Sequence, residues 1–421
     1  MIDLRPNRRC FAATALGLAG FAAMPRPLRA AAVDTSGLTP ITSGLKPIDA
    51  AERAARIARA QALMAKAGMA AIVVEPGSSL DYFTGIKWWR SERVTAAIIP
   101  ASGQPVIVTP FFEEPSIRQS LGVPADVRVW QEDEDPLALV AEALRQAGGA
   151  TSAIGIEETV RFFISDGLAR RLPQARIASA NPVVRACRMV KTATEIALMQ
   201  AASDVTLTAQ RWAWQRIRGG MTPGDIAALI DAATAALGGK ASDGLVLLGE
   251  ASAYPHGSAK PQAVREGEVV LIDCGCSVGG YASDISRSFV FGRVPDDVRR
   301  VWDVVAEGQQ RALAAAQLGT PAGAVDDAAR AFYESKGFGP RYQLPGLSHR
   351  TGHGIGMDGH EPVNLVHNEA TPLAPGMCFS NEPGLYLPGR FGIRLEDCFH
   401  MTEAGPQWFS TPPRSIDAPF G

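Results

Sequence analysis

The sequence has no excess of positive charge, no internal repeat and no low-complexity tract. Its 41 lysines and arginines stand against 43 aspartates and glutamates, which gives a formal net charge of −2. Such a chain offers no basic surface to neutralise a phosphate backbone, so nucleic acid is not expected as a partner. With 421 residues, 46% of them hydrophobic and 20% charged, the chain can bury a large core. Its length indicates two or three domains.

The chain also lacks, near its N-terminus, an apolar run long enough to span a membrane. Residues 10–24 are rich in Ala and Gly and fall short of the roughly twenty apolar residues that a spanning helix needs. The pair Arg8 and Arg9 precedes this run, and three alanines at 30–32 follow it. The arrangement resembles a twin-arginine export signal. We therefore expect residues 1–32 to be a cleaved signal peptide, the location to be periplasmic, and no stable membrane anchor. Cleavage removes five arginines and one aspartate and lowers the formal charge from −2 to −6.

Cysteine is scarce, and its number is odd once the signal peptide is removed. Six cysteines become five, and Cys274 and Cys276 lie two residues apart on one expected strand. This number and spacing do not fit a disulfide framework, although the periplasm would permit one. We expect the five to be small buried hydrophobic residues, with a single bridge between Cys378 and Cys398 as the alternative.

Alternating patterns predict an α/β domain in the first part of the mature chain. Asp49 can cap a helix that runs to Ala67 and ends at Gly68, and the "AAIVV" that follows is typical of a strand. This unit recurs in looser form as far as Ala180. The pattern then changes around residues 181–188.

A second domain follows this change. It begins with a long amphipathic helix over residues 194–218 and a second helix after Pro223, and continues with strands rich in Val, Ile and Phe. The predicted divisions are 1–32 for the signal peptide, 33–48 for a linker, 49–185 for the N-terminal domain and 186–421 for the second domain.

A predicted hairpin in the second domain brings two aspartates together. In "EVVLIDCGCSVGGYASDISRSFVF", residues 268–291, a turn near Val278 and Gly279 would place Asp273 directly opposite Asp284. Opposed side chains have Cβ atoms about 4.5–5.5 Å apart, where like charges repel, so a positive group is expected between them. The alternative, two aspartates that cap loops or face water, fits less well with the apolar flanks "VVLI" and "SFVF".

Further candidate ligands lie in the C-terminal third. Glu382 in "FSNEPGLYL" and Glu396 in "FGIRLEDCF" each interrupt an apolar run, which is costly unless the charge is paired or binds a metal. The stretch "SHRTGHGIGMDGHE", residues 348–361, holds three of the six histidines beside several glycines. Two aspartates, two glutamates and one histidine suit a pair of divalent ions bridged by carboxylates.

These residues and their contexts, "DCG", "SDISR", "GHGIG", "NEPG" and "RLED", resemble the dinuclear site of the pita-bread metallopeptidases. That family includes Xaa-Pro dipeptidase, aminopeptidase P and methionine aminopeptidase. The resemblance runs from about Arg188 to the C-terminus and extends more weakly, through "DYFTGI", to an N-terminal domain of the creatinase and prolidase type. It implies an α/β N-terminal domain, an α+β pita-bread catalytic domain and a homodimer.

The resemblance also implies roles for individual residues. Asp284 and Glu396 would bridge two divalent ions, Asp273 would complete one coordination shell, and His353 and Glu382 would complete the other. Manganese is expected, with zinc, cobalt and iron as alternatives, since carboxylate-rich sites accept all four. Glu382 would also accept the proton of the attacking water.

Four more residues match the family's substrate-handling groups. His360 would hold the scissile carbonyl and its developing negative charge, and His349 would line the pocket for the residue after the cut. His256 would hydrogen-bond the substrate or intermediate. Arg394 would either orient a bridging carboxylate or receive a substrate carboxylate. His367 and His400 match no family residue.

Some positions depart from the family pattern. Asn364 stands where prolidase-like members carry an arginine for the carboxylate of a dipeptide, so strict dipeptidase activity is not expected. Gly359 replaces a β-branched residue. Trp88 and Trp89 could line a pocket, with core packing as the alternative for at least one of them.

Three functions stay open on the sequence. The first is an exported Xaa-Pro peptidase acting on a peptide or small amide substrate. The second is a metal-dependent hydrolase or lyase for a small non-peptide substrate. The third is a non-catalytic binding protein, against which the retention of all five ligands argues.

Overall fold

The computed structural model describes residues 33–242 and 244–420. The expected signal peptide, residues 1–32, lies outside the described residues. Residues 37–421 form one unit. Within the two described ranges, no helix combines the length and the apolar character needed to cross a membrane.

The first helix begins and ends where the sequence predicts. Helix α1, Ala50–Ala67, is capped by Asp49, whose side chain accepts a hydrogen bond from the amide of Glu52 at 2.9 Å. It ends at Gly68, which has a left-handed backbone with φ of 62°. Strand β1, Met69–Val74, follows directly.

Six strands form a mixed sheet in the N-terminal domain, in the order β4-β3-β2-β1-β5-β6. The central strand β1 pairs antiparallel with β2 and parallel with β5. The other strands are β2 Ala96–Pro100, β3 Val106–Pro110, β4 Asp126–Trp130, β5 Ala153–Ile156 and β6 Arg176–Ser179.

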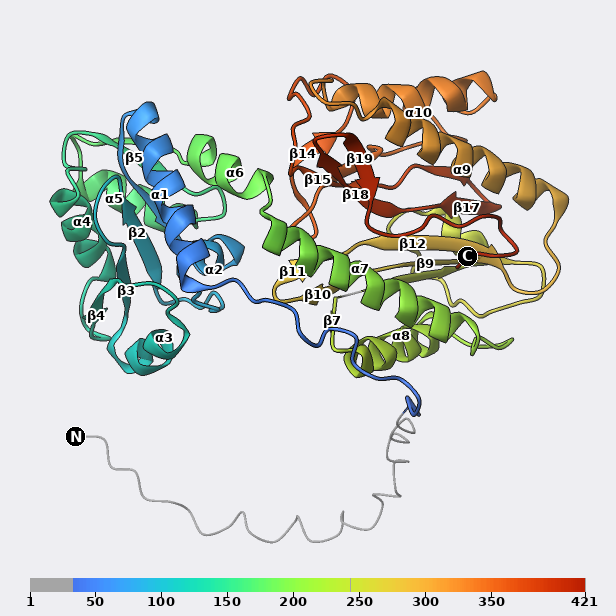
Figure 1. The fold of residues 1–421 in the computed structure, drawn as a ribbon, viewed down its shortest axis with the longest axis horizontal. Helices are drawn as coiled ribbons and strands as arrows, with labels where there is room; N and C mark the ends of the chain where they lie inside the picture. The colour runs from blue at the N-terminus through green and yellow to red at the C-terminus, as the bar shows by residue number, and fades with distance from the viewer. Residues whose placement is uncertain (1–32, 243, 421) are drawn as a thin grey trace, which may run out of the picture. The chain divides into compact units, whose positions relative to one another are not determined.

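Helices cover both faces of this sheet (Figure 1). Ala71 and Val73 of β1 pack in one apolar cluster with α4, Pro136–Gln146, and α5, Phe162–Arg171. Ile72 points the other way and packs with α1 and with α6, Asn181–Met189. Two short helices complete the domain, α2 Ser78–Thr84 and α3 Glu114–Ser120. The prediction of an α/β domain is confirmed.

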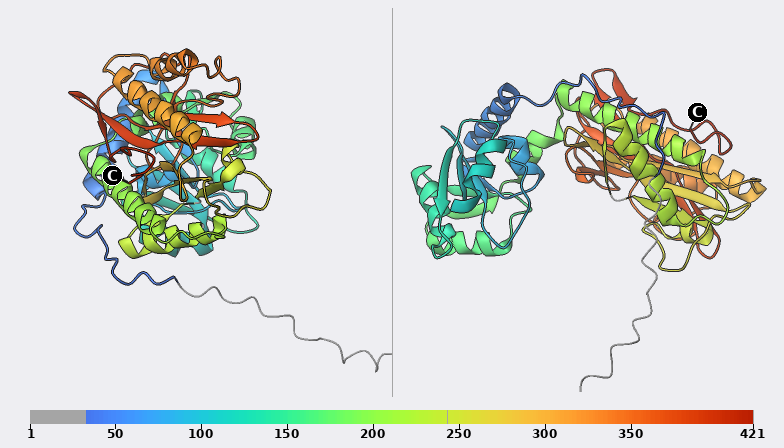
Figure 2. Two further views of the ribbon diagram at one scale, coloured as in Figure 1. Left: turned by 90° about the vertical axis from the view of Figure 1, so that its right-hand side faces the viewer. Right: turned by 90° about the horizontal axis from the view of Figure 1, so that it is seen from below.

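Two helices lead into the second domain and lie side by side (Figure 2). Helix α7, Ala193–Trp214, starts from a capping box between Thr192 and Glu195, and α8, Pro223–Leu237, has its proline in the first turn. The first ends four residues before the predicted Arg218. The predicted domain division after residue 185 falls within α6 and stays a prediction.

The second domain is built from several small antiparallel sheets. The orders are β12-β9-β8, β11-β10-β7, β14-β13-β15-β18-β19 and β16-β17. The first strands are β7 Lys240–Ala241, β8 Leu245–Leu248, β9 Val269–Cys274, β10 Cys276–Val278, β11 Tyr281–Ala282 and β12 Ile285–Val290. The later strands are β13 Gly352–Gly354, β14 Glu361–Leu365, β15 Cys378–Asn381, β16 Gly384–Leu387, β17 Phe391–Arg394, β18 Asp397–Thr402 and β19 Gly405–Trp408.

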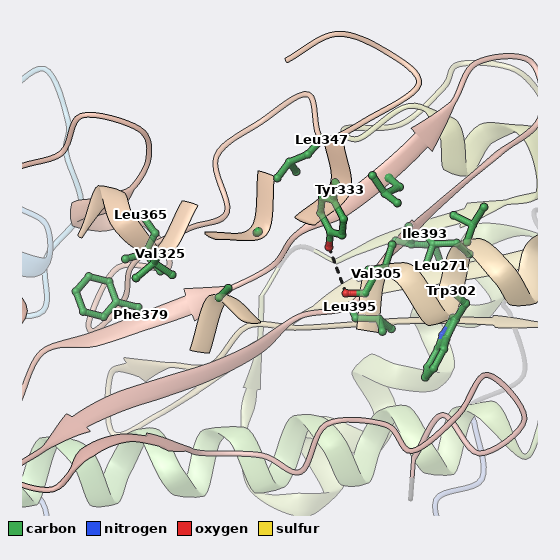
Figure 3. Close-up of a cluster of buried hydrophobic side chains, with 14 of the residues drawn as sticks. Leu271, Trp302, Val305, Val325, Tyr333, Leu347, Leu365, Phe379, Ile393 and Leu395 are labelled. Atoms are coloured by element: carbon green, nitrogen blue, oxygen red, sulfur yellow. Dashed lines mark hydrogen bonds between the residues drawn. The ribbon is translucent and has the colours of Figure 1, made fainter. Parts of the chain in front are cut away.

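Two helices and these strands share the main core of the domain. Helices α9, Asp296–Ala315, and α10, Gly323–Ser335, contribute Val305 and Tyr333 to an apolar cluster with residues of β9 and β17 (Figure 3). The Tyr333 hydroxyl donates to the carbonyl of Val305 at 3.2 Å. This core supports the strands that carry the candidate ligands.

The prediction that Asp273 lies directly opposite Asp284 is wrong. Asp273 pairs with Ser286, because the turn is centred one residue further along the chain than expected. Gly279 and Gly280 form the turn, with φ of 60° and 89°, as a two-residue hairpin with two positive φ angles requires. The residue opposite Asp273 is therefore two positions later than predicted. Because side chains alternate between the two faces of a strand, a shift of two positions does not change the face on which a side chain lies.

The five cysteines behave as expected. All are free thiols and all are buried. Cys398 pairs with Ser380, and Cys378 pairs with His400, so no bridge joins the two.

Candidate metal centre and active site

The five predicted ligands come from separate strand ends and converge on one site. Single ligand atoms of Asp273, Asp284 and Glu396 lie within 4.8 Å of one another, as do those of His353, Glu382 and Glu396. Glu396 belongs to both groups, which is the arrangement that a bridging carboxylate needs. The site lines a cavity of about 930 Å³.

One oxygen of this site has no partner in the described part of the chain. Glu396 is buried, and its Oε1 receives no hydrogen bond. Its other oxygen, Oε2, accepts a hydrogen bond from the Ser286 hydroxyl at 2.8 Å. A buried carboxylate oxygen without a donor is costly unless a cation takes it. The residues therefore fit a divalent metal site.

The buried carboxylates of the site repel one another. Burial, together with the neighbouring Asp273 carboxylate, raises the pKa of Asp284 to about 7. Burial and the Asp284 charge raise the pKa of Glu396 well above its usual range. Crowded carboxylates that resist ionisation are strong candidates to bind divalent cations, which relieve the repulsion.

Glu382 and His353 form a second pair in the site. His353 Nε2 lies 3.3 Å from Glu382 Oε1. Burial alone would raise the pKa of Glu382, but the hydrogen bond with His353 and the nearby His349 outweigh burial and lower it to about 2. Glu382 is thus a carboxylate at neutral pH.

Arg394 holds one of the carboxylates. Its side chain is buried and donates to Asp273 Oδ2, to the Ser286 hydroxyl at 3.1 Å and to the Tyr386 hydroxyl at 3.1 Å. It also donates to the carbonyl of Pro255 at 3.2 Å. The carboxylate that it contacts is Asp273, which is not one of the two assigned as bridging, and the role of Arg394 stays a prediction.

The three predicted substrate histidines and the predicted ligand His353 do not share one environment. His349 is half-buried and its Nε2 lies 2.7 Å from the Tyr386 hydroxyl. His360 is exposed, and its ring centroid lies 4.0 Å from that of His353 at 85°. Its ring is nevertheless partly shielded from water, and this shielding, followed by the charge of His353, lowers the pKa of His360. His256 is exposed, and all four histidines line the same cavity.

The remaining positions singled out in the sequence lie at or beyond the edge of the active-site cavity. Gly359 lines the cavity, and a Cβ there would meet no atom within 4 Å. Asn364 lies opposite His353 and lines a neighbouring cavity of about 490 Å³. Trp89 is 68% exposed and stacks on Trp88, with 4.7 Å between the ring centroids. Trp88 packs against an apolar cluster, which agrees with the predicted alternative that at least one of the two belongs to the core.

Two family models match the chain. Residues 197–403 match "Metallopeptidase family M24", and residues 56–190 match "Creatinase/Prolidase N-terminal domain". The probable dipeptidase PepE of Mycobacterium tuberculosis is 35% identical over 366 residues, which are 86% of this chain and 95% of the relative. The Xaa-Pro dipeptidase of Lactobacillus helveticus is 32% identical over 79% of this chain and 90% of the relative.

The chain belongs to metallopeptidase family M24.

Solved structures agree with this assignment. Dipeptidase PepE from Mycobacterium ulcerans superposes with a TM-score of 0.80 at 33% identity, covering 88% of this chain and 98% of that one. X-Pro aminopeptidase from Thermotoga maritima superposes with a TM-score of 0.75 at 29% identity, and the match covers 86% of this chain and 98% of that one. The predicted combination of a creatinase-type N-terminal domain with a pita-bread catalytic domain is confirmed, and the protein is a peptidase of the M24 family.

Several residues of this M24 site were not found from the sequence. Tyr386 links His349 to Arg394, and Arg287 is wholly buried with its Nη2 2.7 Å from Asp397 Oδ1. Arg287 Nη1 also donates to the carbonyl of Glu396 at 2.9 Å. The available signal was a basic residue inside the apolar strand "ISRSFV". Arg350 lines the cavity as well, and within the described ranges its guanidinium forms no ion pair.

Proposed function

We propose that this protein is an exported peptidase that uses two divalent ions to cleave peptide bonds N-terminal to proline. The observation that carries this proposal is the convergence of all five predicted ligands on one cavity that His349 and His360 also line. Relatives named Xaa-Pro dipeptidase and X-Pro aminopeptidase support the proline preference.

The ions would be held by the two aspartates, the two glutamates and the histidine of the cluster: Asp273, Asp284, His353, Glu382 and Glu396. When bound, such ions supply Lewis-acid chemistry and a more acidic water. Manganese is the proposed metal. The unpartnered Oε1 of Glu396 supports its role as a ligand shared by both ions.

Glu382 is the proposed proton acceptor. Its lowered pKa, caused chiefly by the hydrogen bond with His353 acting against burial, keeps it ionised at neutral pH. It would take a proton from the attacking water and pass it to the leaving nitrogen.

His360 is the proposed donor to the scissile carbonyl. Partial burial of the ring lowers the pKa of His360, so the ring is neutral near pH 7 and one N–H can donate to the oxygen as negative charge develops. His349, fixed by Tyr386, would line the pocket for the residue after the cut. His256 would hydrogen-bond the substrate.

The decisive experiment compares matched peptides. Protein loaded separately with Mn, Zn, Co and Fe is given Xaa-Pro and Xaa-Ala substrates of two, three and more residues, and kcat/KM is measured. The two substrates differ at the scissile bond, because the proline nitrogen carries no hydrogen and cannot donate a hydrogen bond. We expect Xaa-Pro to be cleaved faster than Xaa-Ala. Because Asn364 stands where prolidase-like relatives carry an arginine, longer peptides should be cleaved at least as well as dipeptides. Equal rates for the Pro and Ala members would sink the proline preference, and no cleavage with any metal would favour a small non-peptide substrate.

Export and homodimer formation are part of the proposal. The paired arginines at 8 and 9 and the alanines at 30–32 support cleavage near Val33. N-terminal sequencing of the periplasmic fraction tests it, and an intact Met1 there would count against export. Light scattering of the mature protein tests the dimer.

A further inference from the structure

The position of His360 depends on the backbone that carries it. Both ring nitrogens of His349 and both of His353 have a hydrogen-bonding neighbour within 3.3 Å. For the His360 ring, no hydrogen bond is found anywhere in residues 33–242 and 244–420; its ring contact is with His353. The loop around His360 therefore sets where its Cα lies, and the contact with His353 is the one ring contact found for the imidazole in those residues.

The next residue, Glu361, closes that loop. Its Oε1 accepts hydrogen bonds from the amides of Met357 at 3.0 Å and Asp358 at 3.2 Å. A Cβ at Gly356 would lie 2.8 Å from both carboxylate oxygens of Glu361, so the loop can close on this carboxylate only with glycine there. His360 lies inside the closed segment.

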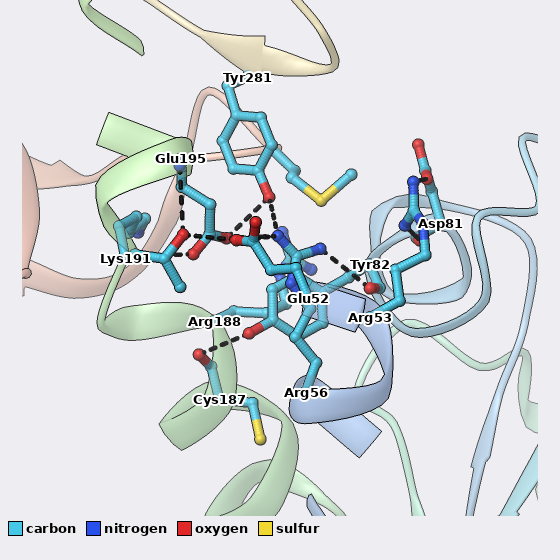
Figure 4. Close-up of polar contacts among 12 residues, drawn as sticks. Glu52, Arg53, Arg56, Asp81, Tyr82, Cys187, Arg188, Lys191, Glu195 and Tyr281 are labelled. Atoms are coloured by element: carbon cyan, nitrogen blue, oxygen red, sulfur yellow. Dashed lines mark hydrogen bonds and ion pairs between the residues drawn. The ribbon is translucent and has the colours of Figure 1, made fainter. Parts of the chain in front are cut away.

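Two cations hold the Glu361 carboxylate from the other side. Arg188 Nη2 lies 2.6 Å from Oε1, and Lys191 Nζ lies 3.0 Å from Oε2. The side chains of Glu361 and Lys191 are 4% and 2% exposed. Arg188 lies in the last turn of α6, and Lys191 lies in the short segment between α6 and α7 (Figure 4). A buried carboxylate held by two cations is rigid, and removal of its charge leaves the cations uncompensated.

The same loop also contacts helix α2 of the N-terminal domain. The Ser78 hydroxyl donates to Asp358 Oδ1 at 2.5 Å, and Arg188 donates to both the Ser79 hydroxyl at 3.0 Å and Asp358 Oδ2 at 2.6 Å. The loop is thus anchored to α2 and to the connecting segment at once.

We infer that Glu361 is a positioning residue, through which the N-terminal domain and the connecting segment fix the backbone of His360 in the active site. The inference rests on the proposed function for the catalytic effect of His360, and on geometry alone for the placement. Glu361 touches neither the substrate nor the candidate ions in this role.

A double-mutant cycle tests it, with Glu361→Gln, His360→Ala and the double variant of the full-length mature enzyme. We expect Glu361→Gln to lower kcat on an Xaa-Pro peptide about tenfold to a hundredfold, with KM changed far less, since a displaced group misses the transition state. In the His360→Ala background the same change should have little further effect. An equal loss of kcat in both backgrounds would overturn the inference.

Glu195→Gln is the matched control. Glu195 is also a buried carboxylate between the domains, with its Oε1 3.2 Å from Arg56 Nη2 and 2.7 Å from the Tyr281 hydroxyl (Figure 4). Its carboxylate accepts hydrogen bonds from Tyr281 and Thr192 and, in the described residues, none from residues 356–361, so any effect on kcat should be the same with and without His360.

A second measurement does not depend on activity. The NMR resonance of the His360 ring, assigned by its absence in His360→Ala, should shift or broaden in Glu361→Gln and in the milder Asp358→Asn, while that of His367 stays in place. An unmoved His360 resonance in both variants would refute the placement. If the wild-type enzyme cleaves no peptide, the proposed function fails and the NMR comparison still decides the inference.

Discussion

The carboxylates of the candidate metal centre differ in whether a hydrogen-bond donor or a basic side chain lies beside them. Asp273 has Arg394 and Glu382 has His353, whereas Glu396 keeps one oxygen without a donor in the described chain. Asp284 Oδ2 lies farther from His353 Nε2, at 4.0 Å, and burial and Asp273 raise the pKa of Asp284 to about 7. Asp284 and Glu396 therefore depend most on bound ions.

At the residue scale, Asp284→Asn should lose bound metal and nearly all peptide hydrolysis. The amide keeps the size of the side chain but removes the negative charge that a divalent ion requires. Metal content per chain by elemental analysis is the measurement. Asp327→Asn, which alters an exposed pair with His367, is the control and should keep its metal. Two ions per chain in Asp284→Asn would remove it as a ligand.

A second prediction at this scale concerns His360, the proposed donor to the scissile carbonyl. His360→Ala should lower kcat by about a hundredfold or more with a much smaller change in KM, because its hydrogen bond strengthens as the oxyanion forms. Steady-state kinetics on an Xaa-Pro peptide is the measurement. His367→Ala should match the wild type; a rise in KM alone for His360→Ala would show that the residue only binds substrate.

At the scale of helices and strands, local signals were predictable and long-range partners were not. The cap Asp49 and the stop Gly68 act within one helix, so sequence defined α1 at both ends. The hairpin was predicted correctly, but its register depended on whether Val278 and Gly279 or Gly279 and Gly280 form the turn. The partner of Arg287 lies 110 residues away, and that of Lys191 lies 170 residues away, and no local pattern encodes such a distance. The four candidate carboxylate ligands were predictable because each stands beside an apolar run, and His353 was chosen among three neighbouring histidines through the family resemblance.

The buried pair of Arg287 on β12 and Asp397 on β18 gives a prediction about stability. Arg287→Met should destabilise the protein by about 3–5 kcal/mol, since Asp397 would stay buried without its cation. Urea unfolding is the measurement. Arg311→Met removes an exposed pair with Glu307 within one helix, where the arginine side chain is 53% exposed, and should change stability by less than about 1 kcal/mol. Similar losses in the two variants would contradict the prediction.

At the scale of the whole molecule, contacts between the domains should make stability depend on acid pH. Burial would raise the pKa of Glu361, but Lys191 and Arg188 outweigh it and lower the pKa from 4.5 to about 2. A depressed folded-state pKa stabilises the protein above pH 4.5, and the contribution, about 3 kcal/mol, is lost as the pH falls toward 2. Unfolding of wild type and Glu361→Gln from pH 6 to pH 2 should therefore converge at the acid end. A constant difference across that range would count against the prediction.

The order of the ligands along the chain decides when the ions can enter. Asp273 comes from the middle of the sequence, and Glu396, which both groups of ligand atoms share, lies close to the C-terminus. A ribosome-bound chain lacks the shared carboxylate until synthesis has passed residue 396, so the full set of candidate ligands exists only after that point. If the finished protein is exported in its folded state, as proposed, the ions are taken up in the compartment of synthesis, and the metal supply there chooses between manganese and its competitors.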